Sequence, residues 1–495
     1  MDRAKTTSAE GSIGSDFLQL DVRSAPPGGL ADWLAGQLRA AVADGRLPIG
    51  GRLPASRVLA AELRVSRGVV TEAYQRLIDD GHAAGRGRAG TVIVAAPVLP
   101  PSPSPDFLPA KVITPLPGAE VFDAVRAAPA RIDLTPGVPD LTAFPRAAWL
   151  RAERAVLDEL EPSHFGYGDP RGAPSMRLAV SRWLARNRGI RVDPGEIIVV
   201  SGVAQALTLL GEVLRQHGVT AVAVEDPGSL GARQHLHHCG LATPPVPVDD
   251  DGVQVAGLDA PAVLLTPAHQ FPTGVVLGGS RRRELLRWAA DGGIVLEDDY
   301  DAEHRYDRAP VPAVRSMLPE VCYMGSVSKL LAPALRVGWL LAPPRFFADL
   351  VAAKRFADLG NAVLAQLVLA RLMETGELER QLRVVRGRHR RRRDAMIQAL
   401  SASLPGAVVH GAAAGLHLTV TFEAEVDDVA VAAAALAEGV KVQPLSWHRQ
   451  RPGRPGLVLG YAARTATEIA EGVAVLGRLV RPLVGPGNGV SERSE

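Results

Sequence analysis

The sequence predicts a multidomain fold in which a small N-terminal winged helix-turn-helix precedes a large α/β domain with a smaller C-terminal α/β lobe. Three observations support this prediction. Two helical patterns separated by a very short turn lie near the N-terminus, a proline-rich stretch follows them, and apolar strand-like runs then alternate with helical stretches. At 495 residues, the chain is long enough for two or three domains.

Composition sets the expected domain boundaries. The winged helix-turn-helix is expected at residues 28–95. Residues 96–130 contain the segment APVLPPSPSPDFLPA and are expected to form a linker, because prolines disfavour helix interiors and favour extended chain. The α/β part is expected at 131–480, with its large domain over about 131–380 and its small lobe over about 381–480.

Composition also excludes several classes of protein. Hydrophobic residues make up 47% of the chain and charged residues 22%, which is typical of globular proteins. No apolar run is long enough to span a bilayer, and the N-terminus lacks the features of a secretory signal. Cys239 and Cys322 lie far apart and have no metal-binding spacing. We therefore expect a cytoplasmic protein that binds no metal and contacts no membrane.

The N-terminal module begins with a helical pattern from Leu30 to Asp44, followed by Gly45 as a stop signal. Two further helices are expected after it, with Ser56 and Ser66 as their capping residues. The Leu63-Arg64-Val65 segment between them is too short for anything but a sharp angle, which is the geometry of a helix-turn-helix.

The second of these helices is the one expected to enter the DNA major groove, with Ser66, Arg67 and Thr71 toward bases or phosphates. The opposite side of the helix is expected to form core. Its residues are Val70, Ala73, Tyr74 and Leu77. A hairpin with a basic tip is expected over residues 85–94, and such a wing can follow the DNA backbone or minor groove.

Arginine is concentrated in this region, although the whole chain carries a net charge of only +2. A local basic excess can neutralise DNA phosphates, whereas for any single arginine a solvated surface charge is the simpler interpretation. The motifs LPASR, VSR, AYQRL and GRAGTVIV resemble the GntR family of winged-helix regulators over residues 30–94. With the helix geometry, the resemblance implies these DNA-contacting residues: Arg57, Ser66, Arg67, Thr71, Arg86, Arg88 and Thr91.

In the α/β part, strand-like runs at 196–201, 221–226, 262–267 and 293–299 alternate with helical stretches, which predicts a mostly parallel sheet. The segment GSVSKLLAPALRVG follows a further apolar run, VCYM. Lys329 in this segment can stay unprotonated among apolar groups and condense with an aldehyde. Seven residues later, Arg336 can grip a phosphate with its planar fork.

Two more segments suit the same ligand. Asp298, Asp299 and Tyr300 end an apolar strand, at the sheet edge where open α/β folds bind ligands. A carboxylate there can pair with a pyridine nitrogen. In Ser201-Gly202-Val203-Ala204, a strand turns into a helix, whose first N–H groups can bind phosphate.

The motifs FGYGDPRGAPSMRLAV, VVSGVAQALTLL, LTPAHQFPTGVVL, LEDDYDAEHRY and GSVSKLLAPALRVGWL resemble fold-type I aminotransferases over about residues 131–470. With the winged helix in front, the chain resembles the MocR subfamily of GntR regulators. This resemblance implies pyridoxal 5'-phosphate as the cofactor, bound to Lys329 as an aldimine. The other cofactor-binding residues expected are Asp298, Tyr300, Arg336, Ser326, Ser328, Gly202, Val203 and Ala204. Asp299 is the rival of Asp298 for the ring nitrogen, because adjacent strand residues point to opposite faces.

Three positions depart from the pattern of working aminotransferases. Ser229 replaces a ring-stacking tyrosine, Phe271 replaces an asparagine that binds the ring oxygen, and Val458 replaces an arginine that clamps the substrate carboxylate. Arg451 and Arg454 are close to the last of these in sequence. The departures favour a sensor without efficient turnover, because a lost clamp removes the orientation that transamination needs.

The expected function is therefore a transcription regulator that binds DNA and senses pyridoxal phosphate, or an amine or amino-acid effector, in its large domain. The alternative is an active aminotransferase with an accessory DNA-binding module, and a third possibility is a scaffold that takes up no cofactor. The resemblance also implies a homodimer whose two winged helices read paired operator half-sites.

Overall fold

The computed structural model divides into two compact units, residues 1–102 and 103–495. We describe each unit by itself. The residues that the structure describes are 20, 22–26, 29–87, 90–95, 112–307 and 311–484.

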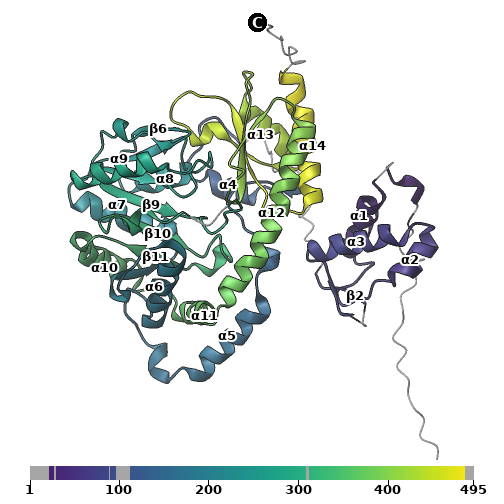
Figure 1. The fold of residues 1–495 in the computed structure, drawn as a ribbon, viewed down its shortest axis with the longest axis horizontal. Coiled ribbons are helices and arrows are strands. Elements are labelled where there is room, and N and C mark those ends of the chain that lie inside the picture. The colour runs from purple at the N-terminus through teal and green to yellow at the C-terminus, as the bar shows by residue number, and fades with distance from the viewer. Residues whose placement is uncertain are drawn as a thin grey trace, which may run out of the picture. The chain divides into compact units, whose positions relative to one another are not determined.

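The first unit is a winged helix-turn-helix, as predicted (Figure 1). Its elements are α1 (Leu30–Ala43), α2 (Ser56–Leu63), α3 (Arg67–Asp79), β1 (Ala83–Gly85) and β2 (Thr91–Ile93). The two strands pair antiparallel, from Ala83 opposite Ile93 to Gly85 opposite Thr91. One apolar core joins the three helices and the hairpin, and it includes the predicted core side of α3.

The turn between α2 and α3 is as sharp as the sequence predicts, because Arg64 adopts the left-handed conformation with φ of 54°. Ser66 caps α3, and its Oγ accepts a hydrogen bond from the backbone N–H of Val69 at 3.4 Å. The predicted cap at Ser56 was wrong. Ala55 holds the capping position of α2, and Ser56 is the first helical residue, whose Oγ instead accepts a hydrogen bond from Arg67 Nε at 3.3 Å.

The second unit is built on an eight-stranded sheet. In spatial order its strands are β4 (Ile197–Val200), β11 (Gly338–Leu341), β10 (Cys322–Ser326), β9 (Ile294–Asp299), β8 (Ala262–Leu265), β5 (Val222–Asp226), β6 (Pro245–Asp249) and β7 (Gly252–Val253). Only β11 and β7 run against the other strands of this sheet. The prediction of a mostly parallel sheet is confirmed.

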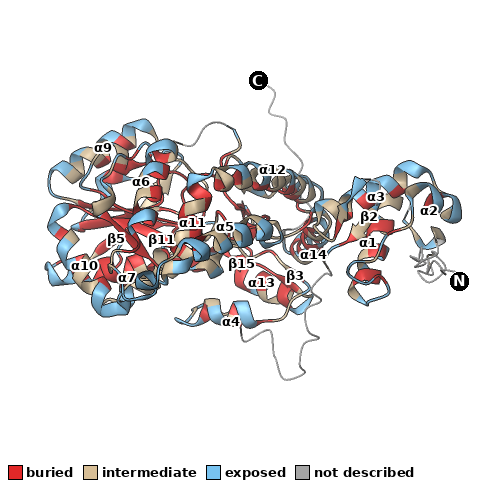
Figure 2. Ribbon diagram, turned by 90° about the horizontal axis from the view of Figure 1, so that it is seen from below, coloured by how far each residue is buried: buried red, intermediate tan, exposed pale blue. Residues whose placement is uncertain are grey.

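Helices cover both faces of the sheet, so its strands are buried on both sides (Figure 2). Ile198 and Val200 of β4 pack into one apolar cluster, whereas Ile197 and Val199 pack into another on the opposite face. The helices of the large domain are α5 (Arg146–Glu159), α6 (Pro174–Arg188), α7 (Val203–Gln216), α8 (Leu230–His238), α9 (Gly279–Ala290), α10 (Pro344–Asp358) and α11 (Val363–Glu374). Among the described helices, none is long and apolar enough to cross a membrane.

The small lobe has a four-stranded antiparallel sheet and its own apolar core. The strands of this sheet, in spatial order, are β12 (Val408–His410), β13 (His417–Thr421), β16 (Gly456–Gly460) and β15 (Gln443–Pro444). The helices are α4 (Val121–Ala127), α12 (Glu377–Ser403), α13 (Asp428–Ala437) and α14 (Ala466–Val484), of which α12 and α14 lie side by side (Figure 1).

The predicted end of the linker needs correction. Residues 112–130 were expected to be linker, but they contain α4, whose Val121 and Val125 lie in the core of the small lobe. Trp447 Nε1 also donates a hydrogen bond to the Thr114 carbonyl at 2.8 Å. Residues 96–111 lie outside the described part of the chain.

The start of the large domain needs a similar correction. β3 (Ile132–Asp133) was expected in the large domain, yet it pairs in parallel with β14 (Val440–Lys441) of the small lobe. The small lobe is therefore assembled from both ends of the α/β part of the chain.

Candidate cofactor pocket and DNA-binding face

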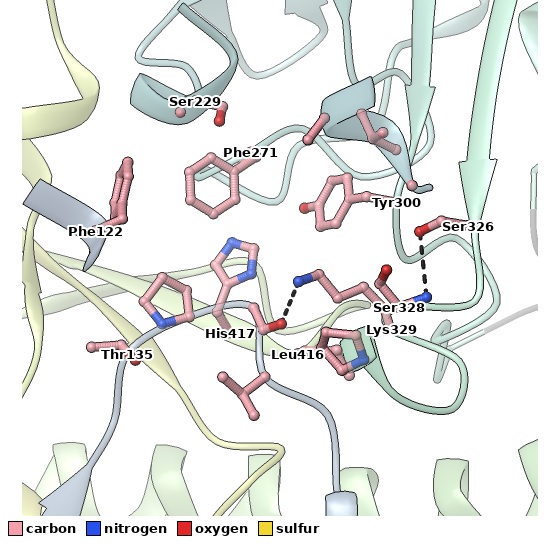
Figure 3. A pocket seen from close by; sticks show the side chains of 18 of the residues that line it. Phe122, Thr135, Ser229, Phe271, Tyr300, Ser326, Ser328, Lys329, Leu416 and His417 are labelled. Atoms are coloured by element: carbon pink, nitrogen blue, oxygen red, sulfur yellow. Dashed lines mark hydrogen bonds between the residues drawn. The ribbon is translucent and has the colours of Figure 1, made fainter. Parts of the chain in front are cut away.

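A cavity of about 480 Å³ opens at the ends of the central strands, between the large domain and the small lobe (Figure 3). Its wall contains all nine residues predicted for the cofactor site, which come from three separate segments of the chain. They are Gly202, Val203, Ala204, Asp298, Tyr300, Ser326, Ser328, Lys329 and Arg336.

Lys329 lies just after β10, and its side chain enters the cavity (Figure 3). The ammonium group donates a hydrogen bond to the Gly137 carbonyl. Burial lowers the pKa of Lys329, although the charges of Asp301 and Asp298 oppose that shift. The result is a lysine that loses its proton more easily than a lysine in water, as a nucleophilic amine requires.

The two adjacent carboxylates of β9 are separated by the strand. Asp298 lines the cavity, whereas Asp299 does not. Asp299 is instead buried against Arg188, whose Nε lies 2.5 Å from its Oδ2, and it accepts a hydrogen bond from Tyr323 Oη at 2.5 Å. Of these two carboxylates, only Asp298 is thus exposed to the cavity.

One oxygen of Asp298 lacks a hydrogen-bond partner among the described residues. This oxygen, Oδ1, is buried. Burial, followed by the nearby charge of Asp299, raises the pKa of Asp298 to about 7. A buried carboxylate oxygen without a partner is suited to receive a donor from a bound molecule.

The far end of the cavity resembles an anion site. Gly202 caps α7 with φ of 98°, a conformation that favours glycine, so the first N–H groups of the helix face the cavity. A Cβ atom built on Gly202 would lie 3.5 Å from Arg336 Nη1 and 3.8 Å from Ser328 Oγ. A guanidinium, a hydroxyl and a helix N-terminus therefore converge on one place.

Arg336 has an unusual backbone, because it is a non-glycine residue with φ of 51°. Asn361 supports it from behind, since its Nδ2 donates to the Arg336 carbonyl at 3.4 Å and to Ser201 Oγ at 2.6 Å. Such conformations cost energy and persist where the surrounding structure holds them, most often at functional sites.

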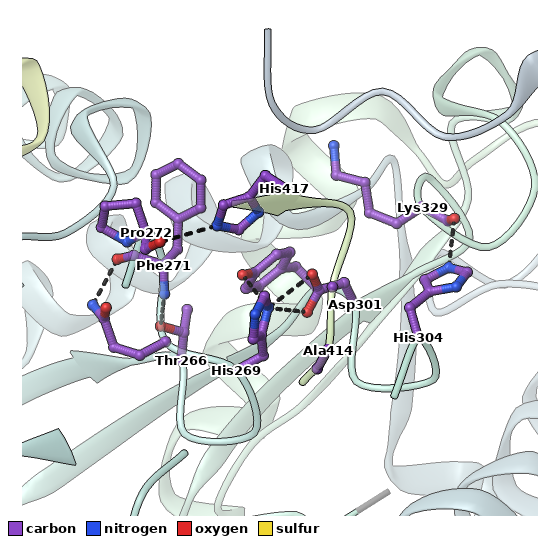
Figure 4. Close-up of polar contacts among 12 residues, drawn as sticks. Thr266, His269, Phe271, Pro272, Asp301, His304, Lys329, Ala414 and His417 are labelled. Atoms are coloured by element: carbon purple, nitrogen blue, oxygen red, sulfur yellow. Dashed lines mark hydrogen bonds and ion pairs between the residues drawn. The ribbon is translucent and has the colours of Figure 1, made fainter. Parts of the chain in front are cut away.

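Tyr300 belongs to a polar group that no sequence motif reveals. Its Oη lies 2.9 Å from His269 Nδ1. The same nitrogen lies 3.0 Å from Asp301 Oδ2 (Figure 4). Burial and the charge of Asp301 hold the pKa of Tyr300 well above its usual value, so the phenol stays protonated. His304 Nε2 makes a further contact, to the Lys329 carbonyl at 3.0 Å.

Two of the three departures from the aminotransferase pattern lie on the cavity wall, at Ser229 and Phe271. Ser229 has a structural task, because its Oγ caps α8 by accepting a hydrogen bond from the Ala232 N–H at 3.2 Å. The ring of Phe271 has its centroid 5.0 Å from each of the rings of His417 and His448.

The cavity also has lining residues that the sequence did not point to. Phe122 comes from α4, and His417, Gln443 and His448 come from the small lobe. These residues belong to no sequence motif. Their place on the cavity wall is known only from the way the small lobe packs against the large domain.

On the winged helix, the predicted DNA contacts lie at the surface. Arg57, Ser66, Arg67, Thr71 and Arg86 are exposed, and Thr91 is half-buried. The prediction for Arg88 lies outside the described residues.

Comparison with known proteins identifies both units. A model of the bacterial regulatory proteins of the gntR family matches residues 30–93, and a model of aminotransferase class I and II matches residues 131–476. The chain is 30% identical to the uncharacterized HTH-type transcriptional regulator YhdI of Bacillus subtilis over 94% of this chain and 98% of that protein. It is also 30% identical to the probable rhizopine catabolism regulatory protein MocR of Rhizobium meliloti, over 88% of this chain and 91% of that protein.

Solved structures of aminotransferases resemble the second unit. The kynurenine aminotransferase of Pyrococcus horikoshii matches with a TM-score of 0.67 at 27% identity, over 74% of this chain and 94% of that chain. LysN, the alpha-aminoadipate aminotransferase of Thermus thermophilus, matches with a TM-score of 0.65 at 27% identity, over 76% of this chain and 97% of that chain.

The groups in the cavity fit pyridoxal phosphate. The buried amine of Lys329 suits its aldehyde, the unpartnered oxygen of Asp298 suits its ring nitrogen, and Arg336 with the start of α7 suits its phosphate. The chain belongs to the MocR-type regulators of the gntR family, transcription regulators in which a DNA-binding winged helix precedes a pyridoxal phosphate-binding domain of aminotransferase class I and II.

Proposed function

We propose that this chain is a cytoplasmic, homodimeric regulator whose DNA binding responds to pyridoxal phosphate and to a small amine or amino acid in the cavity beside Lys329. One observation carries the proposal. A lysine of lowered pKa, an unpartnered buried carboxylate and a phosphate-type cradle line one cavity, in a chain that begins with a winged helix.

Each group in the cavity has a task in this proposal. Lys329 would supply the amine that bonds the cofactor, Asp298 would accept a hydrogen bond from the protonated ring nitrogen, and Tyr300 would contact the ring oxygen. Arg336, Ser326, Ser328 and the N–H groups at residues 202–204 hold the phosphate. When bound, pyridoxal phosphate supplies an aldehyde that reacts with primary amines and a visible chromophore that reports the reaction.

The residues around the cavity support sensing over turnover. Ser229 offers no aromatic ring that could stack on the cofactor. Phe271 has no polar side-chain atom that could bind the ring oxygen of the cofactor. Transamination needs a substrate held in one reactive orientation, and weaker positioning lowers the rate steeply. A regulator needs only that the ligand favour one conformation over another.

The first test is the visible absorbance of the purified protein with added pyridoxal phosphate, wild type beside Lys329→Ala. The wild type is expected to develop a visible band that the variant lacks. Borohydride reduction followed by peptide mass analysis should place the adduct on Lys329. An adduct on another lysine, or no band in either protein, contradicts the assigned site.

The second test separates a sensor from an enzyme. With amino donors and keto acids, the loaded protein is expected to show slow turnover or none, while the ligand changes its affinity for operator DNA. Efficient steady-state turnover without a change in DNA affinity would instead support an active aminotransferase with an accessory DNA-binding module.

A further inference from the structure

The cavity has a side that the assigned cofactor contacts do not use. We call it the effector side, and it is formed by Phe122, Phe271, Leu416, His417, Gln443 and His448. Figure 3 labels the first four of these residues. Three of these six residues, the two phenylalanines and the leucine, are apolar, and the other three are polar but uncharged in the arrangement described below. The polar groups of the effector side decide which small molecule it accepts.

The sheet of the small lobe presents a neutral face to this side. His417 and Gln443 line the cavity. Val458, on the middle strand β16, is paired with Gln443 on β15 and with Thr419 on β13. Residues directly opposite one another in a sheet share a face. Fully buried Val458 therefore lies on the cavity-facing side of this sheet, between Gln443 and Thr419, and adds no charge there.

His417 is an uncharged acceptor. Its Nε2 lies 3.2 Å from the Pro272 carbonyl, which can only accept, so this nitrogen carries the proton. Burial lowers the pKa of His417 to about 4, so the ring is neutral at neutral pH. Its Nδ1 therefore carries no proton and can accept a hydrogen bond. The Gly137 carbonyl, which accepts a hydrogen bond from Lys329 Nζ, is a second acceptor near the amine.

His448 is neutral as well. The Leu230 N–H donates to its Nδ1 at 3.4 Å, so Nε2 carries the proton and donates to Gln443 Oε1 at 3.2 Å. Burial lowers the pKa of His448 to about 3. The amide N–H groups of Gln443 remain as an uncharged donor on the effector side.

Cations on the described cavity wall are confined to three residues. Lys329 and Arg336 belong to the cofactor site. Arg126, on α4, has a side chain that is 70% exposed and is ion-paired with Asp123. No buried cation on the described wall is therefore left for a carboxylate beside the amine of a ligand.

We propose that the effector is a primary amine with an apolar body and no carboxylate next to the amine, and that Phe122 and Phe271 contact that body. This inference rests on the proposed function. An amine approaching Lys329 meets the Gly137 carbonyl and His417 Nδ1, which accept its N–H groups. A carboxylate on the neighbouring carbon would meet the same two acceptors and lose its hydration, with only the uncharged amide N–H groups of Gln443 as donors on this side and no cation.

A matched pair of ligands tests the proposal. 2-Phenylethylamine and phenylalanine differ only in the carboxylate, and both are titrated into wild-type protein loaded with pyridoxal phosphate. The readouts are the change in visible absorbance and the heat of binding. We expect the amine to bind more than tenfold more tightly than either enantiomer of phenylalanine. Equal or tighter binding of phenylalanine overturns the inference.

A variant tests the role of Phe122. Phe122→Ala should reduce the preference for 2-phenylethylamine over ethylamine about tenfold, because the aromatic contact is lost while the amine contacts remain. A merely structural role would change both affinities together and would contradict the assignment. Phe356→Ala is the matched control, because Phe356 is 87% exposed on α10 and does not line the cavity.

The two levels of failure are distinguishable. If the wild type shows no visible band with pyridoxal phosphate, the proposed function fails and this inference falls with it. If the band forms but phenylalanine is preferred, only the inference about the effector is wrong.

Discussion

Asp298 and Asp299 are neighbours on β9, yet they meet different surroundings, because a strand turns successive side chains to opposite faces. Asp299 shares its carboxylate between Arg188 and Tyr323, and Arg188 is fully buried. Asp298 faces the cavity with an unpartnered oxygen. One residue is therefore suited to stability and the other to binding.

Removing the charge of Asp299 is expected to destabilise the protein strongly. Asp299→Asn leaves the guanidinium of Arg188 buried beside a neutral group, and breaking a buried ion pair costs about 3–5 kcal/mol. Denaturant unfolding of the cofactor-free protein at pH 7 measures the loss. Asp298→Asn is the control, with a free energy of unfolding equal to or above that of the wild type. Equal losses in the two variants would contradict the division of tasks.

The pH dependence of stability gives a separate prediction for Asp298. Its pKa is about 7 in the folded protein and near 3.8 without that environment, so between pH 4 and 7 the folded state binds more protons than the unfolded state. The stability from this group is therefore fully present below pH 4 and is lost as the pH rises toward 7.

Thermal unfolding of the cofactor-free protein across this range provides the measurement. Relative to Asp298→Asn, the wild type should become less stable as the pH rises from 4 to 7. Other buried groups titrate in both proteins, so only the difference between the two is interpreted. A constant difference across the range would show that Asp298 is already ionised at low pH.

At the scale of elements, α4 has an unexpected position, because the sequence around it looks like linker. Its Val121 and Val125 lie in the core of the small lobe, and Phe122 lines the cavity. The segment that follows residues 96–111 is thus part of the cavity wall. A ligand that packed on Phe122, as we propose, would contact the part of the α/β unit nearest in sequence to the DNA-binding unit.

Truncation tests the importance of this segment. A chain that begins at residue 112 is expected to fold, whereas one that begins at residue 131 should be poorly soluble or melt at a much lower temperature. The shorter chain lacks several fully buried apolar side chains, each worth roughly 1.5–3 kcal/mol. Solubility and thermal unfolding measure the difference, and identical melting of the two chains would show that residues 112–130 do not stabilise the lobe.

Helix α3 allows a test of the DNA-binding face. Arg67→Ala is expected to reduce the slope of log affinity against log salt concentration by about 1, because one phosphate contact is lost. Arg46→Ala is the matched control, since Arg46 follows α1 and is bonded to Asp44. An unchanged slope for Arg67→Ala would place Arg67 outside the phosphate contacts.

At the scale of the whole molecule, a homodimer with two winged helices should protect two operator half-sites. We expect sedimentation at twice the mass of one chain, and footprints centred about 10 base pairs, or a multiple of that, apart. Footprinting of the upstream DNA, with and without pyridoxal phosphate, is the measurement. Protection of a single half-site by a monomer would contradict the proposed assembly.

The residues that sequence motifs predict for the cofactor site all line the cavity, because each lies near a strand end that passes into a local turn. Lys329 follows β10, Asp298 lies at the end of β9 and Gly202 joins β4 to α7. Ser56 shows where local signals were insufficient. Its hydroxyl suits a cap, but the helix begins one residue earlier than the cap required. The proline-rich composition likewise concealed α4, which is stabilised by the core it joins rather than by its own sequence.

By itself, the sequence determined the two folded units, the strand ends that carry Lys329, Asp298 and Arg336, and the family, because these depend on short segments with local backbone signals. Only the tertiary structure decided which of the adjacent carboxylates faces the cavity. It alone also brought Phe122, His417 and the Gln443–His448 pair to one wall of the cavity. These residues stand far apart in the chain and carry no motif, and they meet because the small lobe buries both ends of the α/β segment in one core.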